Sequence, residues 1–499
     1  MTFPLIDIAI KGSSRDSLTK QLYDQLRAII LSGTVASGTR LPSSRDLSEQ
    51  LGLSRNTVMT AYEQLVAEAY LESRVGAGTF VVQDLPDAFL RTQHQPSSDP
   101  QPATKRPRKS RRKLSERGNI LASASFGLRD HFKRPRAFQT GLPDIHSFPS
   151  KLWAQMTSRR YRDHVDNLLQ SPAPAGYIPL REEIVNYLST TRGVRCTPEQ
   201  VIIVNGSQQA LDLAARILLN VGDEACVEDP GYLGTLAAIR GSGAVALPIP
   251  INEEGFDVDT ARKRAPYAKL ISVTPSRQYP LGITMSLVRR LELLNWASEI
   301  DAWILEDDYD SEYRYKGLPL AALQGLDNEG RVIYIGTFSK LMFPSLRLGY
   351  MVVPLEFVES FTAAHAVTDR GSSWLHQSVM AEFIAEGHFT RHIRKMRTLY
   401  AQRQAALVNA AERHLDGILD VQPEDAGMHV IGRLPERWDD VLASELVAKA
   451  GIEAEPLSRS AIESTHHQGL LLGYTGVTEP EIEEAARTMA QALRKLRES

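Results

Sequence analysis

One lysine in this chain has a setting that suits covalent cofactor chemistry. Lys340 closely follows the apolar run 331–336, which predicts a buried strand. A second apolar run, 302–305, ends in the acids Glu306 and Asp307. Pyridoxal phosphate (PLP) requires a lysine for its Schiff base, and its pyridinium nitrogen requires a carboxylate that makes the ring an electron sink. The two strand ends therefore predict a PLP site with Lys340 as the Schiff-base lysine and Asp307 as the partner of the ring nitrogen.

A phosphate cup is expected beside this pair. Hydroxyl and guanidinium side chains flank the lysine, and the short apolar run 201–204 leads through Gly206 into a predicted helix. The backbone N–H groups and the dipole at the start of such a helix attract an anion. We expect the cofactor phosphate to be held by Ser207, Gln208, Thr337, Ser339 and Arg347.

The elements that position these residues alternate between strand and helix through residues 200–350. This order predicts an α/β domain with a mainly parallel sheet, helices on both faces and the cofactor at the carboxyl ends of the strands.

A different pattern occupies residues 17–82. Residues 17–31 carry an apolar stripe at helical spacing, formed by Leu18, Leu22, Leu26, Ile29 and Ile30. Ser43 or Ser44 can cap a short helix that runs through Gln50, and Ser54 can cap the next helix. The segment 71–82 then reads as a hairpin with glycines at its tip. These elements occur in the order of a winged helix-turn-helix.

The first turn after Ser54 presents Arg55, Asn56 and Thr57, whose side chains can read base edges in a major groove. Arg45, on the preceding helix, is expected to contact DNA phosphates instead. We also place Gly76, at the tip of the wing, among the DNA-binding residues.

Composition limits the other possibilities. The chain has 499 residues and a formal net charge of −3, so it should form more than one domain and shows no overall basic bias. Its two cysteines, Cys196 and Cys226, have no metal-binding spacing and fit a reducing cytoplasm. No stretch approaches 18 apolar residues. We expect a cytoplasmic protein with no metal site and no membrane partner.

The segment joining the two patterns is polar. Residues 86–117 are rich in Gln, Ser, Pro and basic side chains and include the basic run 105–113. Such a segment cannot bury enough apolar area to fold alone, so it is expected to be a mobile tether. A second expected role is loose contact with DNA phosphates. The expected domains are 1–85 for DNA binding, 86–120 as the linker and 121–499 for the cofactor.

The chain resembles a known family in both parts. Residues 41–80 are similar to the GntR-type DNA-binding domain, and the remainder resembles fold-type I aminotransferases. The fusion is that of the MocR/GabR subfamily of bacterial transcription regulators. The aminotransferase-like motifs are Gly141-Leu-Pro-Asp144, Pro179-Leu-Arg181, Gly206-Ser-Gln-Gln-Ala210, Glu228-Asp-Pro-Gly-Tyr232, Thr274-Pro-Ser276, Glu306-Asp-Asp-Tyr-Asp310 and Thr337-Phe-Ser-Lys340.

The resemblance implies further roles and a homodimer. Tyr232 matches the aromatic residue that lies on the cofactor ring, and Tyr309 matches the residue that contacts the ring hydroxyl or the substrate. Arg459 resembles the arginine that holds an effector carboxylate. The chain departs from the pattern at Tyr279, where aminotransferases usually have an asparagine, and before Gly176, where relatives commonly have a tyrosine and an acid.

Two functions remain open from the sequence. The favoured one is a transcription regulator that binds promoter DNA and senses a small amine, an amino acid or PLP itself through Lys340. The alternative is a working aminotransferase with an appended DNA-binding domain. The departure at Tyr279 favours a sensor, because it places efficient transamination in doubt.

Overall fold

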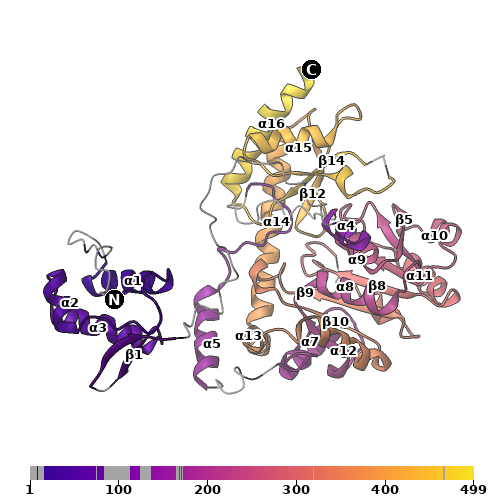
Figure 1. Cartoon of the computed structure of the whole chain (residues 1–499). Coiled ribbons are helices and arrows are strands. Elements are labelled where there is room, and N and C mark those ends of the chain that lie inside the picture. The colour runs from indigo at the N-terminus through magenta and orange to yellow at the C-terminus, as the bar shows by residue number, and fades with distance from the viewer. Residues whose placement is uncertain are drawn as a thin grey trace. The chain divides into compact units, whose positions relative to one another are not determined.

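The computed structural model describes residues 16–74, 76–83, 113–123, 136–163, 172–317, 320–464 and 467–498, together with residues 8, 10, 168 and 170. The chain divides into two compact units, residues 1–111 and 112–499. Figure 1 shows the elements of each unit. Among the described helices, none has the length and apolar character needed to cross a membrane.

The first unit is a three-helix domain with a hairpin. Its elements are α1 (Leu18–Leu31), α2 (Ser44–Leu51), α3 (Arg55–Ala67), β1 (Leu71–Arg74) and β2 (Gly78–Val81). The side chains of Ser17, Ser43 and Ser54 cap the three helices. Leu26, Leu47, Leu65 and Val81 belong to one apolar core that joins the helices to the hairpin. The predicted winged helix-turn-helix is therefore confirmed, with Ser43 rather than Ser44 as the cap of α2.

The second unit is built on a large sheet. Its strands are β3 (Val201–Val204), β4 (Glu224–Asp229), β5 (Val245–Asn252), β6 (Gly255–Phe256), β7 (Leu270–Val273), β8 (Trp303–Asp308), β9 (Val332–Thr337) and β10 (Gly349–Val352). The described strands lie in the order β3-β10-β9-β8-β7-β4-β5-β6. The pairs from β5 through β4, β7 and β8 to β9 are parallel, whereas β10 runs antiparallel to both neighbours. The prediction of a mainly parallel sheet is confirmed.

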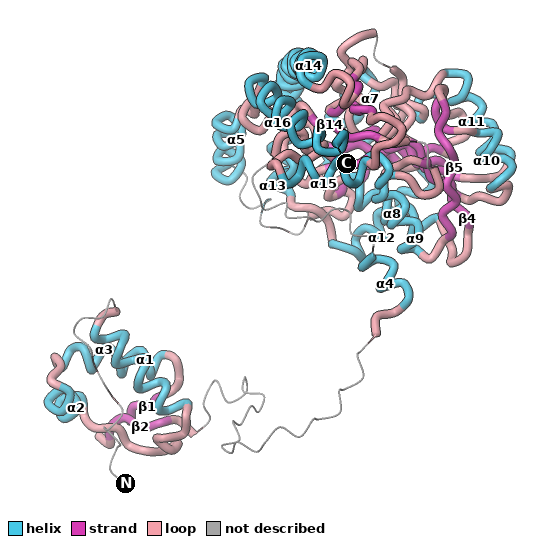
Figure 2. Tube along the Cα trace, turned by 90° about the horizontal axis from the view of Figure 1, so that it is seen from above, coloured by secondary structure: helices cyan, strands magenta, loops and turns pink. Residues whose placement is uncertain are grey.

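Helices cover both faces of this sheet (Figure 2). α8 (Ser207–Leu218), α9 (Leu233–Ser242) and α12 (Val358–Asp369) pack on one face, where Ile202 and Val204 meet them in one apolar cluster. The alternate residues Val201 and Ile203 point into a different cluster, which includes α7 (Ile178–Thr191). α10 (Val258–Arg264) and α11 (Leu287–Glu299) cover another part of the sheet. Apolar runs without alternation follow from this two-sided burial.

The carboxyl-terminal part forms a smaller antiparallel sheet with its own helices. Its strands are β11 (Asp420–Val421), β12 (His429–Arg433), β14 (Gly469–Gly473) and β13 (Glu455–Pro456), in that order. The helices α14 (His388–His414), α15 (Asp440–Lys449) and α16 (Glu479–Glu498) accompany this sheet, whereas α13 (Trp374–Ala385) packs on α7 and α5 (Ser150–Asp163) packs on α13. The short 3-10 turn η6 (Leu457–Ser460) follows β13.

The described end of the predicted linker is helical. α4 (Glu116–Ser123) lies against α9: Arg117 donates hydrogen bonds to the carbonyls of Gly241 and Ser242, at 2.7 and 2.6 Å. Leu121 packs on Gly241, where an added Cβ would lie 2.8 Å from the leucine side chain. Residues 86–112 of the predicted linker, which include all of its basic run except Lys113, lie outside the described residues. The end of the predicted linker next to the large unit thus includes a helix, α4, that is anchored to α9.

Candidate functional site

The sheet brings the predicted lysine and aspartate to one edge. β8 and β9 are parallel neighbours, with Asp307 paired in register with Ile335, so their carboxyl ends lie side by side. Lys340 is half-buried just beyond β9, and its Nζ lies 6.0 Å from the centre of the Tyr309 ring. Gly141 faces the amine: a Cβ at this positive-φ residue would lie 2.5 Å from Nζ. The space around the lysine amine therefore depends on a glycine at position 141.

Asp307 is a buried carboxylate with spare hydrogen-bonding capacity. It is 5% exposed, and its Oδ1 has no hydrogen-bond partner among the described residues. The pKa of Asp307 is raised to about 7, mainly by burial and also by the neighbouring charge of Asp308, while Lys340 opposes the shift. A positively charged N–H donor would stabilise the ionised form of this buried carboxylate by a charge-assisted hydrogen bond. A protonated pyridine ring is such a donor.

The predicted phosphate groups approach one another. Gly206, with φ +107°, precedes the first residue of α8, Ser207, so the N-terminus of that helix opens toward the site. A Cβ on Gly206 would lie 3.8 Å from both terminal nitrogens of Arg347. The backbone N–H of Ser339 donates to Thr337 Oγ1 at 3.2 Å, while Ser339 Oγ is buried with no partner among the described residues. The helix end, the guanidinium and the free hydroxyl suit a phosphate.

Aromatic side chains line the space next to Lys340. The Tyr232 ring is 37% exposed and stands edge-on to Tyr279, with ring centres 6.0 Å apart. Tyr279 meets Tyr309 at the same separation. Gln208 donates to the Gly234 carbonyl at 3.0 Å, and its Oε1 is buried without a partner among the described residues. A Cβ on Gly234 would collide with the Tyr232 ring and with Gln208 Oε1, which shows how closely these groups pack.

The unpartnered atoms test whether the residues fit PLP. Asp307 Oδ1, Gln208 Oε1 and Ser339 Oγ are all buried without a partner among the described residues, although a folded protein normally pairs such atoms. They belong to the residues predicted to surround the ring and the phosphate. The set of donors and acceptors therefore fits PLP.

The residues around the missing asparagine have other partners. Arg277 donates from Nε to the Ala426 carbonyl at 3.0 Å and from Nη2 to the His429 carbonyl at 2.9 Å. Gln278 donates to the Pro230 carbonyl at 2.8 Å. Tyr279 presents an aromatic ring where the usual asparagine would present an amide. Arg277 also donates from Nη1 to the Tyr309 hydroxyl at 3.4 Å, so the side chains of Arg277 and Gln278 are both held by protein partners.

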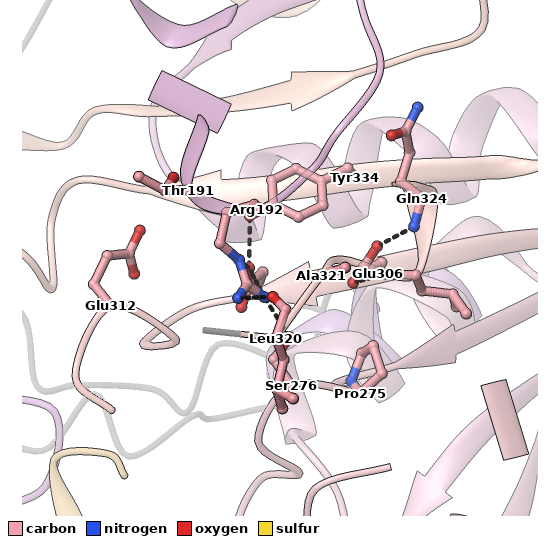
Figure 3. A network of polar contacts seen from close by, with 12 residues as sticks. Thr191, Arg192, Pro275, Ser276, Glu306, Glu312, Leu320, Ala321, Gln324 and Tyr334 are labelled. Atoms are coloured by element: carbon pink, nitrogen blue, oxygen red, sulfur yellow. Dashed lines mark hydrogen bonds and ion pairs between the residues drawn. The ribbon is translucent and has the colours of Figure 1, made fainter. Parts of the chain in front are cut away.

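A buried ion pair behind Asp307 was not predicted from the sequence. Figure 3 shows Arg192 with Ser276, Leu320 and Tyr334 around it. Arg192 forms an ion pair with Asp308 at 2.8 Å and donates to Ser276 Oγ at 2.6 Å. The Tyr334 hydroxyl also donates to Asp308, at 2.6 Å. The crowding of acids at 306–312 indicates that a buried cation is needed, but it does not reveal which one.

Arg459 lies on an element attached to the same edge. It is exposed, and no ion pair links it to a described residue. The carbonyl of Ser460 accepts a hydrogen bond from the backbone of Gly231, beside Tyr232, at 2.9 Å. Leu457 belongs to a small apolar cluster against which Tyr279 packs. The turn that carries Arg459 is thus fixed to the loops that carry Tyr232 and Tyr279, which form an aromatic row with Tyr309.

The DNA-binding candidates divide between capping and exposed side chains. Ser54 accepts from the Thr57 backbone at 3.1 Å, and the two hydroxyls are 2.8 Å apart. Arg55 and Asn56 are exposed in the same turn, and Arg55 Nε reaches Ser44 Oγ at 3.4 Å. Ser54 and Thr57 therefore fix the start of α3, while Arg55 and Asn56 remain available to a base edge.

The other two candidates are also exposed. Arg45 on α2 pairs with Glu49 at 3.3 Å, one turn farther along the helix. Gly76 lies at the tip of the hairpin with φ +75° and open space around it. An exposed ion pair of this kind is weak, so it leaves Arg45 free to exchange Glu49 for a phosphate.

Two known families match the chain, one in each of its two compact units. Residues 18–81 match the family described as bacterial regulatory proteins, gntR family, and residues 145–489 match aminotransferase class I and II. The probable rhizopine catabolism regulatory protein MocR of Rhizobium meliloti is 41% identical over 481 residues, covering 96% of this chain and 94% of that protein. The chain belongs to the MocR-type family of transcription regulators. The pyridoxine biosynthesis regulator PdxR of Corynebacterium glutamicum is 28% identical, covering 94% of each chain.

Solved aminotransferase structures match the larger unit of this MocR-type regulator. The kynurenine aminotransferase of Pyrococcus horikoshii has a TM-score of 0.67 and 29% identity, covering 77% of this chain and 96% of that one. The α-aminoadipate aminotransferase LysN of Thermus thermophilus, complexed with N-(5'-phosphopyridoxyl)-L-leucine, has a TM-score of 0.69 and 28% identity, covering 76% of this chain and 97% of its own. The fold predicted from the sequence is confirmed. Because this aminotransferase family depends on PLP, the chain carries a PLP-type fold.

Proposed function

We propose that this regulator binds PLP covalently through Lys340 and uses the site to sense a small amine or amino acid, or PLP itself. The observation that carries the proposal is the placement of Lys340 and Asp307 at the ends of neighbouring parallel strands. The unpartnered buried oxygen of Asp307 gives the ring nitrogen a defined partner. When bound, PLP supplies an aldehyde that condenses reversibly with primary amines.

The residues of this chain divide the remaining work. Asp307 holds a proton at the ring nitrogen, and Tyr232 and Tyr309 confine the ring. Ser207, Gln208, Thr337, Ser339 and Arg347 hold the phosphate. We further propose that Arg459 grips the carboxylate of an effector through two parallel hydrogen bonds, because it is exposed beside the aromatic row.

The DNA side of the proposal rests on the first unit. Arg55 and Asn56 would read base edges, with Ser54 and Thr57 holding the helix start, and Arg45 and the backbone at Gly76 would contact phosphates. We propose a homodimer, since a two-fold assembly presents two such units to paired half-sites. We place the functional boundaries at 1–85, 86–120 and 121–499 and the protein in the cytoplasm.

An active aminotransferase is the second candidate. It is favoured by the complete Lys340 and Asp307 pair and by similarity to the aromatic-amino-acid aminotransferase 1 of Thermococcus litoralis, 31% identical over 363 residues that cover 71% of this chain. Tyr279 stands against it, because a ring takes the place of the asparagine amide.

The experiment that tests the proposal joins both units. DNA fragments bound by the full-length protein are selected from a random library, and their affinity is measured with the apo-protein, with PLP, and with PLP plus each of a panel of amines. We expect PLP or one amine to change the affinity at least several-fold. Rapid steady-state turnover of amino donors, with no such change in DNA affinity, would favour the enzyme.

A further inference from the structure

An aspartate outside the cofactor site is bonded to the turn that opens toward the phosphate. Asp369 is the last residue of α12, and its side chain is 23% exposed. Its Oδ2 accepts from Asn205 Nδ2 at 2.7 Å and from Gln209 Nε2 at 2.6 Å. Its Oδ1 accepts from the backbone of Gly371 at 2.8 Å and lies 3.2 Å from His365 Nε2. Asp369 therefore joins α12 to both flanks of the β3–α8 turn.

The oxygens of the two amide side chains also bind within the protein. Gln209 Oε1 accepts from the backbone N–H of Asn205 at 2.6 Å, which closes the turn across Gly206. Asn205 Oδ1 accepts from Ser372 Oγ at 2.8 Å. Asn205 and Gln209 therefore flank the turn residues whose N–H groups face the site. Their contacts fix the direction of the turn.

Gly206 and the first residues of α8 set the geometry of this turn. Gly206 has φ +107°, a conformation in which side chains are strained, and its Cα packs on Gly349 so closely that a Cβ on Gly349 would lie 2.9 Å away. The first N–H groups of α8 have no partner within their own helix. Their orientation therefore depends on side chains that hold the turn from outside.

We propose that Asp369 is a positioning residue for the cofactor phosphate, acting through Asn205 and Gln209 on the first N–H groups of α8. The proposal rests on the PLP site argued above. The partners of Asp369 are Asn205, Gln209, Gly371 and His365, so its influence should fall on recognition of the phosphate. Recognition of the phosphate can be separated from recognition of the ring and aldehyde, because pyridoxal carries the same aldehyde and ring nitrogen as PLP but lacks the phosphate.

The test compares dissociation constants for PLP and pyridoxal, measured from the absorbance of the covalent complex in the full-length protein. Asp369→Ala should weaken PLP about tenfold, as expected for the loss of charge-assisted hydrogen bonds, and should change pyridoxal binding less than about twofold. Asp369→Asn keeps one acceptor oxygen, so its dissociation constant for PLP should lie between those of Asp369→Ala and the wild type. Inorganic phosphate should protect the apo-protein against heat less in Asp369→Ala than in the wild type.

Asp223 offers a matched control. It also accepts from an asparagine, Asn220, through the backbone at 2.7 Å and the side chain at 3.1 Å, but it lies just before β4, at the amino end of that strand. Asp223→Ala should leave the ratio of the two constants unchanged. If Asp369→Ala does not fold, Gln209→Ala removes the same link from the other side and should show the same selective loss.

The outcomes separate this proposal from the cofactor assignment. A wild-type protein that forms no covalent complex with either aldehyde contradicts the PLP site and this proposal with it. A wild-type complex together with an unchanged PLP-to-pyridoxal ratio in the Asp369 variants contradicts only the positioning role. Equal weakening of both aldehydes also contradicts it, because that result indicates a general structural effect.

Discussion

Replacing Asp307 by asparagine should stabilise the apo-protein while weakening its hold on PLP. The carboxyl is buried, and its pKa rises from 3.8 to about 7. Because the folded state binds this proton more tightly than the unfolded state, the stability of the apo-protein falls as the pH rises from about 4 to about 7 and is level above that. At roughly 1.4 kcal/mol per pKa unit, the ionised carboxylate costs about 4 kcal/mol at pH 8.

An asparagine amide removes that charge but introduces its own buried N–H groups. Asp307 Oδ1 has no partner among the described residues, so the new amide leaves polar atoms unpaired at a cost of about 1–3 kcal/mol. We therefore expect Asp307→Asn to be more stable than wild type by about 1–3 kcal/mol at pH 8. At pH 5 the wild-type penalty is only about 2 kcal/mol, so the advantage should disappear.

The assay is urea unfolding of the apo-protein at pH 8 and pH 5, followed by tryptophan fluorescence. This signal reports the large unit alone, because all the tryptophans lie there: Trp153, Trp296, Trp303, Trp374 and Trp438. Added PLP should then raise the midpoint of the wild type more than that of Asp307→Asn. A variant that is less stable than wild type at pH 8, or a difference that does not depend on pH, would refute the reasoning.

The neighbouring aspartate is the matched control. Asp308 is paired with Arg192 at 2.8 Å, and the arginine side chain is 4% exposed. Asp308→Asn removes one partner of a buried ion pair, which costs about 3–5 kcal/mol. The same chemical change one residue along the chain should therefore destabilise the protein, in contrast to Asp307→Asn.

Other predictions concern the lysine, the recognition helix and α4. Lys340→Ala should abolish the absorbance band that borohydride locks in the wild type, with little loss of stability; a persistent band would contradict its role. Arg55→Ala and Asn56→Ala should each cost about 1–3 kcal/mol of specific DNA binding, whereas Arg45→Ala should weaken binding to all sequences alike and lower its salt dependence. Wild-type footprints from the first two would place the reading surface elsewhere. Arg117→Ala should speed amide hydrogen exchange in α4 and at the end of α9, because two hydrogen bonds between them are lost; unchanged exchange would show that other contacts hold α4.

Local chemistry explains which features the sequence could predict. The cap at Ser54, the glycine-tipped hairpin and the ends of β8 and β9 each depend on residues close together in the chain. Lys340 and Asp307 are distant in the sequence, and they come together because β8 and β9 are parallel neighbours in the sheet.

The supporting contacts could not be predicted in this way. Arg192 meets Asp308 across 116 positions, and Asp369 meets Asn205 across 164. Many arginines and aspartates could satisfy the same electrostatic requirement, and only the packing of α7 and α12 on the sheet selects these. The anchoring of α4 likewise depends on Gly241, whose missing side chain leaves room for Leu121. A glycine at this position does not indicate in the sequence which residue will pack on it.

The central claim is that chemistry at Lys340 controls DNA binding by the other unit. The most direct measurement is the affinity of full-length wild type and Lys340→Ala for one selected DNA fragment, each as apo-protein, with PLP, and with PLP plus the active amine. We expect the wild-type affinity to change between these states and the affinity of Lys340→Ala to stay the same. Equal affinities for the wild type in all three states, or an undiminished response in Lys340→Ala, would contradict it.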